Sequence, residues 1–149
     1  MKRVFLMIFL LSQPVLALEV REVDVFSERD TETLLKCQVT SGSATAAVEA
    51  ALRGNRIRID SKSQLNFYIQ LTGVEISSGG GCAVVANLSV YYLASVPVTF
   101  PSNKKTILAT VELCRRLNLL TGPKYDLQSR VNSALSDLTN RCVSDIERM

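Results

Sequence analysis

The sequence predicts a two-layer α+β domain, an antiparallel sheet with two helices on one face, the second of them long and C-terminal. Leu65 to Leu71 alternates strictly between apolar and polar residues, and a β-rich run follows from Cys82 to Val96. Asp126 to Ile146 instead repeats apolar residues at three- and four-residue steps, the pattern of an amphipathic helix. Consecutive strands joined by short turns pair antiparallel, and helices with one apolar face cover such a sheet.

The remaining strands are predicted from shorter patterns. A Val-rich stretch from Leu18 to Phe26 is a possible first strand, Arg56 to Asp60 alternates briefly, and Thr106 to Leu113 forms the last strand. Pro97 and Pro101 are expected to close the long strand, and Leu119 to Lys124 is expected to be a turn. Alternation predicts which residues face the helices: Leu65, Phe67, Ile69 and Leu71; Val84, Ala86, Leu88 and Val90; and Ile107, Ala109, Val111 and Leu113.

The first helix is predicted to begin near Thr45, a residue type that caps helices, and to end at Gly54-Asn55. Ser27 to Thr40 is ambiguous between helix and extended chain. The C-terminal helix carries one apolar stripe, which consists of Leu127, Val131, Leu135, Leu138, Cys142 and Ile146.

The N-terminus has the pattern of a secretory signal peptide. Lys2 and Arg3 precede an apolar run from Val4 to Leu11. Pro14 then breaks the helix, and Val15 and Ala17 stand at the −3 and −1 positions of a cleavage site. The run is too short to span a bilayer, which needs about 20 residues. We therefore expect residues 1–17 to be removed and residues 18–149 to form a single domain in the periplasm or outside the cell.

Four cysteines in an exported chain indicate two disulfides. Cys82 and Cys142 both point toward the interior, but the last helix starts beside the Cys82 end of the sheet and runs away from it. Cys142 then lies about 24 Å along the helix, close to Cys114 instead. The predicted pairs are Cys37–Cys82 and Cys114–Cys142. Strict alternation turns Cys114 outward, so the second pair requires a bulge or the end of regular strand there.

Several segments together resemble a group of exported bacterial α+β proteins without assigned activity. They are VEAALRGNRIRID (residues 48–60), LNFYIQL, the long strand after Cys82 and ATVEL. In that group a tryptophan stands where this chain has Val111. The resemblance implies a fold and an extracytoplasmic location, and it transfers no function.

The chain contains no histidine, which excludes histidine-based triads and histidine metal sites. Oxidised cysteines are not nucleophiles. We expect no metal and no cofactor, and catalysis is left only to a carboxylate pair or a serine–lysine pair. The turn Ser77 to Gly81 lacks the lysine and helix start of a phosphate-binding loop.

Two surfaces are candidates for binding. Alternation points five residues away from the helices: Tyr68, Val85, Tyr91, Leu93 and Leu108. This leaves either an interaction surface or a face covered by residues 18–40. The second candidate is a basic cluster that could contact an anion or could simply protect an edge strand: Arg53, Arg56 and Arg58.

These observations favour an exported binding module that lacks catalytic activity. An inhibitor or immunity protein of an envelope enzyme is an alternative, and a carboxylate-based hydrolase is another. The net charge of +3 falls by two when Lys2 and Arg3 are removed, so we expect no nucleic-acid partner. The expected partner is another envelope protein or a second copy, with no membrane span after processing.

Overall fold

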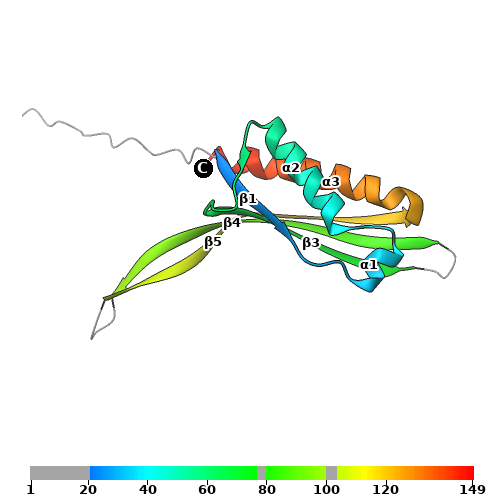
Figure 1. Ribbon diagram of the computed structural model, residues 1–149, viewed down its shortest axis with the longest axis horizontal. Helices are drawn as coiled ribbons and strands as arrows, with labels where there is room; N and C mark the ends of the chain where they lie inside the picture. The colour runs from blue at the N-terminus through cyan, green and yellow to red at the C-terminus, as the bar shows by residue number, and fades with distance from the viewer. Residues whose placement is uncertain (1–20, 77–79, 100–103) are drawn as a thin grey trace, which may run out of the picture.

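The computed structural model describes residues 21–76, 80–99 and 104–149, and this part of the chain forms a five-stranded sheet with three helices (Figure 1). The predicted α+β class is confirmed. The predicted signal peptide, residues 18–20 and most of the Ser77–Gly81 turn lie outside the described residues. In chain order the elements are β1 (Glu22–Ser27), α1 (Glu32–Lys36), α2 (Ser41–Gly54), β2 (Arg58–Ile59), β3 (Leu65–Glu75), β4 (Gly81–Thr99), β5 (Lys104–Pro123) and α3 (Lys124–Ile146).

The sheet is mixed, in the order β2-β1-β3-β4-β5. β3, β4 and β5 pair antiparallel as predicted, whereas β1 runs parallel to both β2 and β3. The prediction of a wholly antiparallel sheet is therefore wrong for β1. Parallel strands need a crossover, and α1 and α2 provide it because they lie between β1 and β2 in the chain.

Helices α1 and α2 both begin at a threonine cap. The Thr31 hydroxyl accepts the backbone N–H of Leu34 and so starts α1 within the ambiguous segment. The Thr40 hydroxyl accepts the backbone N–H of Ser43, so α2 begins four residues before the predicted Thr45. α2 ends at Gly54 with Asn55 as its C-cap, as predicted.

The core lies between the sheet and the helices. α2 and α3 pack side by side, joined at their polar rims by the Asn55–Asn140 and Ser43–Asn132 hydrogen bonds. The predicted inward residues of β3 and β4 are buried, as is the whole apolar stripe of α3. Each large apolar side chain buried in this way contributes about 1.5–3 kcal/mol, so this double layer accounts for most of the stabilisation by burial.

Beyond the core, β4 and β5 continue as a two-stranded projection that we call the projecting hairpin, residues 93–99 and 104–110 (Figure 1). β3 pairs with β4 only as far as Tyr92. Pro97, expected to end the strand, instead pairs with Thr106 within it. It is tolerated because no strand among the described residues pairs with the other edge of β4 here, so the missing N–H breaks no ladder bond.

The two disulfides join Cys37 to Cys82 and Cys114 to Cys142, which confirms the predicted pairs. Val90 pairs with Cys114 whereas Tyr91 pairs with Glu112, so β5 has one extra residue between them. This bulge turns Cys114 to the helix side, where it is only 8% exposed. The bulge that the pairing requires is therefore present.

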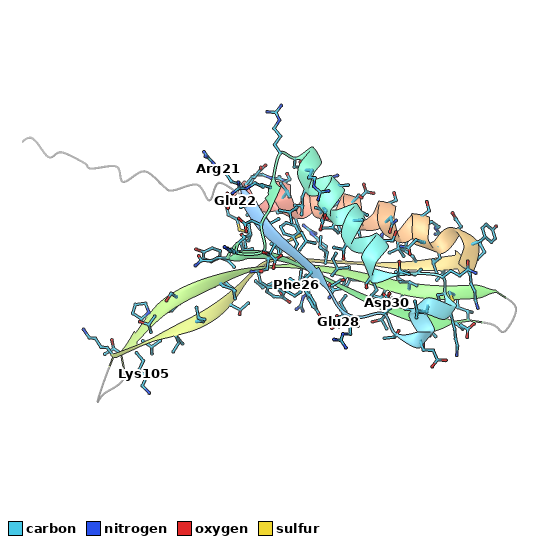
Figure 2. All side chains as sticks on the ribbon, in the orientation of Figure 1. Arg21, Glu22, Phe26, Glu28, Asp30 and Lys105 are labelled. Atoms are coloured by element: carbon cyan, nitrogen blue, oxygen red, sulfur yellow. A yellow bond between two sulfur atoms is a disulfide. The ribbon has the colours of Figure 1, made fainter. Side chains whose placement is uncertain are left out.

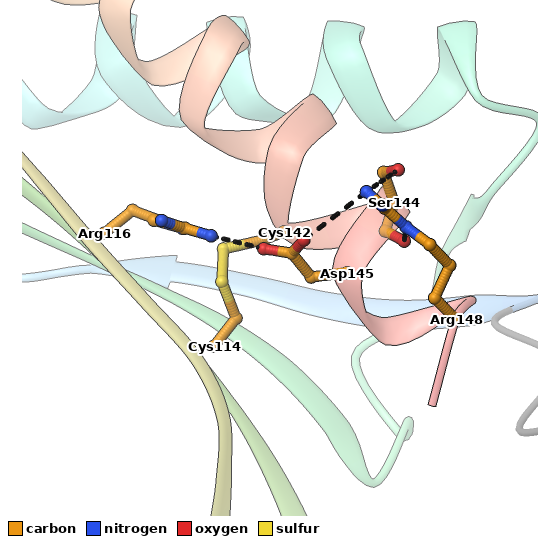
Figure 3. A network of polar contacts seen from close by, with 6 residues as sticks. All are labelled: Cys114, Arg116, Cys142, Ser144, Asp145 and Arg148. Atoms are coloured by element: carbon orange, nitrogen blue, oxygen red, sulfur yellow. Dashed lines mark hydrogen bonds and ion pairs between the residues drawn. A yellow bond between two sulfur atoms is a disulfide. The ribbon is translucent and has the colours of Figure 1, made fainter.

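An ionic network lies beside the second disulfide (Figure 3). Arg116 of β5 contacts the Asp145 carboxylate of α3 at 2.5 Å, and Arg148 contacts the same carboxylate at 3.5 Å while also donating to Ser144. The hydrogen bond from Arg116 holds the pKa of Asp145 below its ordinary value. Together the disulfide and the ion pairs fix the end of α3 to β5 where the covered sheet ends.

Candidate interaction surface

The face of the sheet opposite the helices, which we call the outward face, is formed by alternate residues of β1, β3, β4 and β5. Strand pairing brings these residues into rows across the sheet. One row contains Phe26, Tyr68, Ser89 and Arg115, and the next contains Asp24, Asn66, Tyr91 and Glu112. Further rows pair Thr72 with Val85 and Leu119, Gln70 with Asn87 and Leu117, Leu93 with Thr110, and Ser95 with Leu108.

The residues predicted to point away from the helices all belong to the outward face: Tyr68, Val85, Tyr91, Leu93 and Leu108. The described part of the N-terminal segment does not cover them. β1 joins the sheet as a strand and adds Asp24 and Phe26 to the outward face, and α1 lies on the other side. Gly73 faces the helix side, because it pairs with the buried Val84, and a Cβ atom added at Gly73 would lie 3.3 Å from Leu34 of α1. Helix α1 therefore packs against the helix side of β3. Of the two alternatives, cover of this face by the N-terminal segment does not hold for residues 21–40.

Polar contacts order the middle of the outward face. The Glu28 carboxylate, labelled beside Phe26 in Figure 2, accepts hydrogen bonds from the Tyr68 hydroxyl and from Gln70. The Tyr68 ring packs on Phe26 with ring centres 5.1 Å apart. The hydrogen bond to Glu28, with partial burial, raises the pKa of Tyr68 to about 12. Tyr68 therefore stays neutral at physiological pH and acts here as a fixed hydrogen-bonding and packing group.

Phe26, Glu28, Tyr68 and Gln70 form a group of contacts that we call the polar strip, and Arg115 of β5 extends this strip toward the sheet edge. It interacts with the Tyr91 side chain and with Glu112, whose carboxylate lies 2.8 Å away, and both interactions raise the pKa of Arg115. Its guanidinium is about half exposed. The strip thus ends in a positive group that is held in place and remains accessible.

Two oxygens beneath this strip have no hydrogen-bond partner among the described residues. They are Asn87 Oδ1 and Ser89 Oγ, both of them buried. Ser89 is 1% exposed, although none of the described elements covers the outward face, because it lies in one row between Tyr68 and Arg115. Burying unpaired polar atoms is unfavourable by about 1–3 kcal/mol each, so bonding capacity remains unused at the centre of this face.

Large apolar side chains flank the polar strip. Leu117 and Leu119 are 66% and 60% exposed beside it, and Leu108 on the projecting hairpin is 79% exposed. Val74 and Leu93 extend the exposed apolar surface along β3 and β4. Sequence reasoning missed Leu117 and Leu119 because it expected a turn at Leu119 to Lys124. The alternating residues Leu117, Asn118 and Leu119 are the signal that could have extended the strand.

The basic cluster does not converge on one point. Arg53 pairs with Glu49 at 2.6 Å on the exposed face of α2, and Arg58 pairs with Glu22 across the β1–β2 edge. Arg56 lies between them in a turn with a positive φ of 63°. Two of the three guanidiniums thus already have carboxylate partners, and Arg58 occupies the edge strand of the sheet.

Within residues 21–76, 80–99 and 104–149, no group of three or more cysteine, aspartate or glutamate side chains is placed to hold a metal ion. The four cysteine sulfurs are all in disulfides. No helix in the described part is both long and apolar enough to cross a bilayer.

No protein-family model matches the chain, and no curated protein sequence matches it. Similar folds occur among solved structures. The PelC dodecamer of Paraburkholderia phytofirmans is 15% identical, with a TM-score of 0.45 and coverage of 90% of this chain and 91% of that one. A PelC variant from the same organism gives a TM-score of 0.44 at 15% identity over 86% of each chain. A minor lipoprotein of Acinetobacter baumannii is 10% identical, with a TM-score of 0.39 and coverage of 87% and 92%. This resemblance is weak, and no function transfers with it.

Proposed function

We propose that this chain is an exported, disulfide-stapled interaction module that binds another protein of the cell envelope through its outward face. The observation that carries the proposal is the face itself. Its exposed leucines surround an ordered polar strip, and none of the described helices covers it. Contiguous apolar surface rimmed by polar groups is typical of interaction sites.

The disulfides support the extracytoplasmic part of the proposal. Disulfides persist in oxidising compartments such as the periplasm and the extracellular space. The basic and apolar N-terminal stretch, Lys2 to Leu11, is consistent with export to such a compartment. Periplasmic or secreted protein is therefore the location that we assign.

The proposal assigns no catalysis to the chain. The sequence has no histidine, and the thiols are oxidised. Glu75 and Asp145 are held by Lys124 and Arg116, and these hydrogen bonds lower both carboxyl pKa values. Paired carboxylates with low pKa values are poor general acids near neutral pH, which disfavours the alternative of a carboxylate-based hydrolase. An inhibitor or immunity protein would use the same face, and the identity of the partner distinguishes it from a general module.

The test compares substitutions on the two sides of the sheet. Tyr91→Asp places a charge at the centre of the outward face, and Leu35→Asp changes an exposed leucine of α1 on the helix side. With protein isolated from its own envelope fraction after chemical cross-linking, we expect one stoichiometric partner with wild type and with Leu35→Asp, and none with Tyr91→Asp.

Thermal melts of the purified variants provide the control. Tyr91 is partly buried and contacts Arg115, so Tyr91→Asp should lower the melting temperature but keep a single cooperative transition. Equal cross-linking by both variants would contradict the proposal, as would loss of the partner only in Leu35→Asp.

A further inference from the structure

The outer edge of β5 is open. β5 is the last strand in the sheet order, and no described strand pairs with its second edge. Proteins usually protect such edges because unpaired N–H and C=O groups recruit other strands. The β5 edge carries charged residues and the bulge at Leu113, and Arg130 donates to the Thr121 carbonyl oxygen at one end, but none of the described elements covers it.

The backbone of β5 shows which residues face this edge. The Lys124 N–H donates to the Gly80 carbonyl across the β4–β5 pair, so alternate residues back from Lys124 point toward β4. Thr121, Leu119, Leu117 and Arg115 must then point their backbone groups to the open edge. The bond from Arg130 to the Thr121 carbonyl agrees with this direction.

The same holds on the far side of the bulge. The Leu93 N–H donates to the Gln64 carbonyl on the β3 side of β4. The backbone groups of the adjacent Tyr92 therefore point toward β5, and those of Val111, the β5 partner of Tyr92, point toward β4. Glu112, and the alternate residues Thr110 and Leu108 beyond it, therefore face the open edge. Along the whole strand, the residues whose backbone faces the edge are those of the outward face.

One register allows two copies of β5 to pair over their full length. Directly opposed residues of an antiparallel pair must share a face. When the two bulges lie opposite each other at a two-fold axis, Glu112 opposes Arg115 of the second copy. The same register opposes Leu108 with Leu119 and Thr110 with Leu117, all outward residues. A register displaced by two residues, with Thr110 opposite Arg115, still opposes outward residues, but it leaves Gly122 and Pro123 without partners and places Glu112 opposite Leu113.

Charge favours the same register. Glu112 meets Arg115 of the other copy twice, once on each side of the axis, and opposite charges across a strand pair are stabilising. The other charged residues of β5 oppose uncharged ones: Lys104 opposes Pro123, Lys105 opposes Gly122, and Arg116 opposes Val111. No like charges are therefore opposed. β5 supplies 20 residues from each copy, the size of a standard interface of about 20–30 residues a side.

We propose that this protein forms a two-fold dimer in which the β5 edges of two copies pair antiparallel around the bulge at Leu113, making one continuous sheet. This interface uses the strand edge and goes beyond the proposed binding of an envelope protein by the outward face. Purified protein alone tests it, so the two proposals can fail separately.

The experiment exchanges the charges at the axis in protein produced from the full sequence with both disulfides formed. Glu112→Arg and Arg115→Glu each oppose like charges, and the double variant restores opposite charges. By sedimentation equilibrium, we expect wild type and the double variant to be dimers, and each single variant to dissociate with a dimer Kd about tenfold higher. Each single variant also loses the internal Glu112–Arg115 pair, which the double variant regains.

A second pair of variants tests the backbone without changing charge. Thr110→Pro removes an edge-facing N–H and should abolish the dimer, whereas Thr110→Val keeps that N–H and should leave it intact. Melting temperatures measured on dilute monomer show whether each variant is folded. A monomeric wild type, an assembly larger than a dimer, single variants that dimerise like wild type, or a double variant that stays monomeric would each overturn the proposal.

Discussion

The two ends of the β4–β5 pair have similar residue types and very different surroundings. In the covered half, residues 82–90 of β4 with 114–122 of β5, every second β4 side chain is buried beneath α3. In the projecting hairpin, Val96 and Ile107 lie on the same side of the sheet yet are exposed, because α3 is tied by Cys142 to Cys114 and does not cover the hairpin. Alternation thus determines the side to which a residue points, and the covering layer determines whether it is buried.

The largest expected effect contrasts two leucines on these strands. Leu88 is fully buried, and Leu88→Ala should lower the free energy of unfolding by about 2–5 kcal/mol because it leaves a cavity. Leu108→Ala on the projecting hairpin should change the stability of the monomer by about 0.5 kcal/mol or less. Urea unfolding of dilute protein measures both changes. Similar losses for the two variants would show that the hairpin is buried in the monomer.

The next effect concerns the disulfide at the boundary between the two regions. Cys114 and Cys142 are separated by 28 residues, and removal of this bond as Cys114→Ala with Cys142→Ala should destabilise the protein by about 3.5 kcal/mol. The boundary should also loosen, so amides of β5 near Cys114 should exchange faster with solvent than those near Leu120. Hydrogen exchange read by mass spectrometry checks this. Unchanged exchange around Cys114 would mean that packing alone fixes the end of α3.

The smallest expected effect is a loss of stability in acid, which should come from ion pairs outside the projecting hairpin. Hydrogen bonds from Arg116 and Lys124 lower the pKa values of Asp145 and Glu75 in the folded state. The stability that these pairs contribute is fully present above the ordinary pKa values, 3.8 for Asp145 and 4.5 for Glu75. It is lost as the pH falls through the lower pKa values of the folded state. The described part of the projecting hairpin has no carboxylate side chain.

Melting temperatures across the acid range test this sign. Arg116→Gln combined with Lys124→Gln should melt below wild type near neutral pH, and the difference should shrink below about pH 3, where carboxyl groups become protonated. Lys62→Gln, at an exposed turn, is the matched control. A difference that grows in acid would contradict the assigned pairs.

The sequence predicted the inward residues of β3 and β4 because strict alternation reports the two faces of a strand directly. It predicted both disulfides because helix rise and strand rise fix how far each cysteine lies along its element. It missed the parallel pairing of β1, since a strand's own pattern does not identify its neighbours. Pro97 and Leu119 were misjudged for a related reason: both lie where strands lack a neighbour on one edge, so the usual signals for ending a strand do not apply. The outward face was predicted from Tyr68, Tyr91 and Leu108, but Leu117 and Leu119 of β5 were not.

The order of the cysteine pairs has a consequence for how the protein is made. The first cysteine in the chain bonds with the second, and the third bonds with the fourth. A chain that is oxidised as it emerges with its N-terminus first can join Cys37 to Cys82 before Cys114 arrives, and then join Cys114 to Cys142. Neither bond has to be broken and exchanged. Oxidation in order of appearance therefore leads directly to the native covalent structure, without a disulfide isomerase.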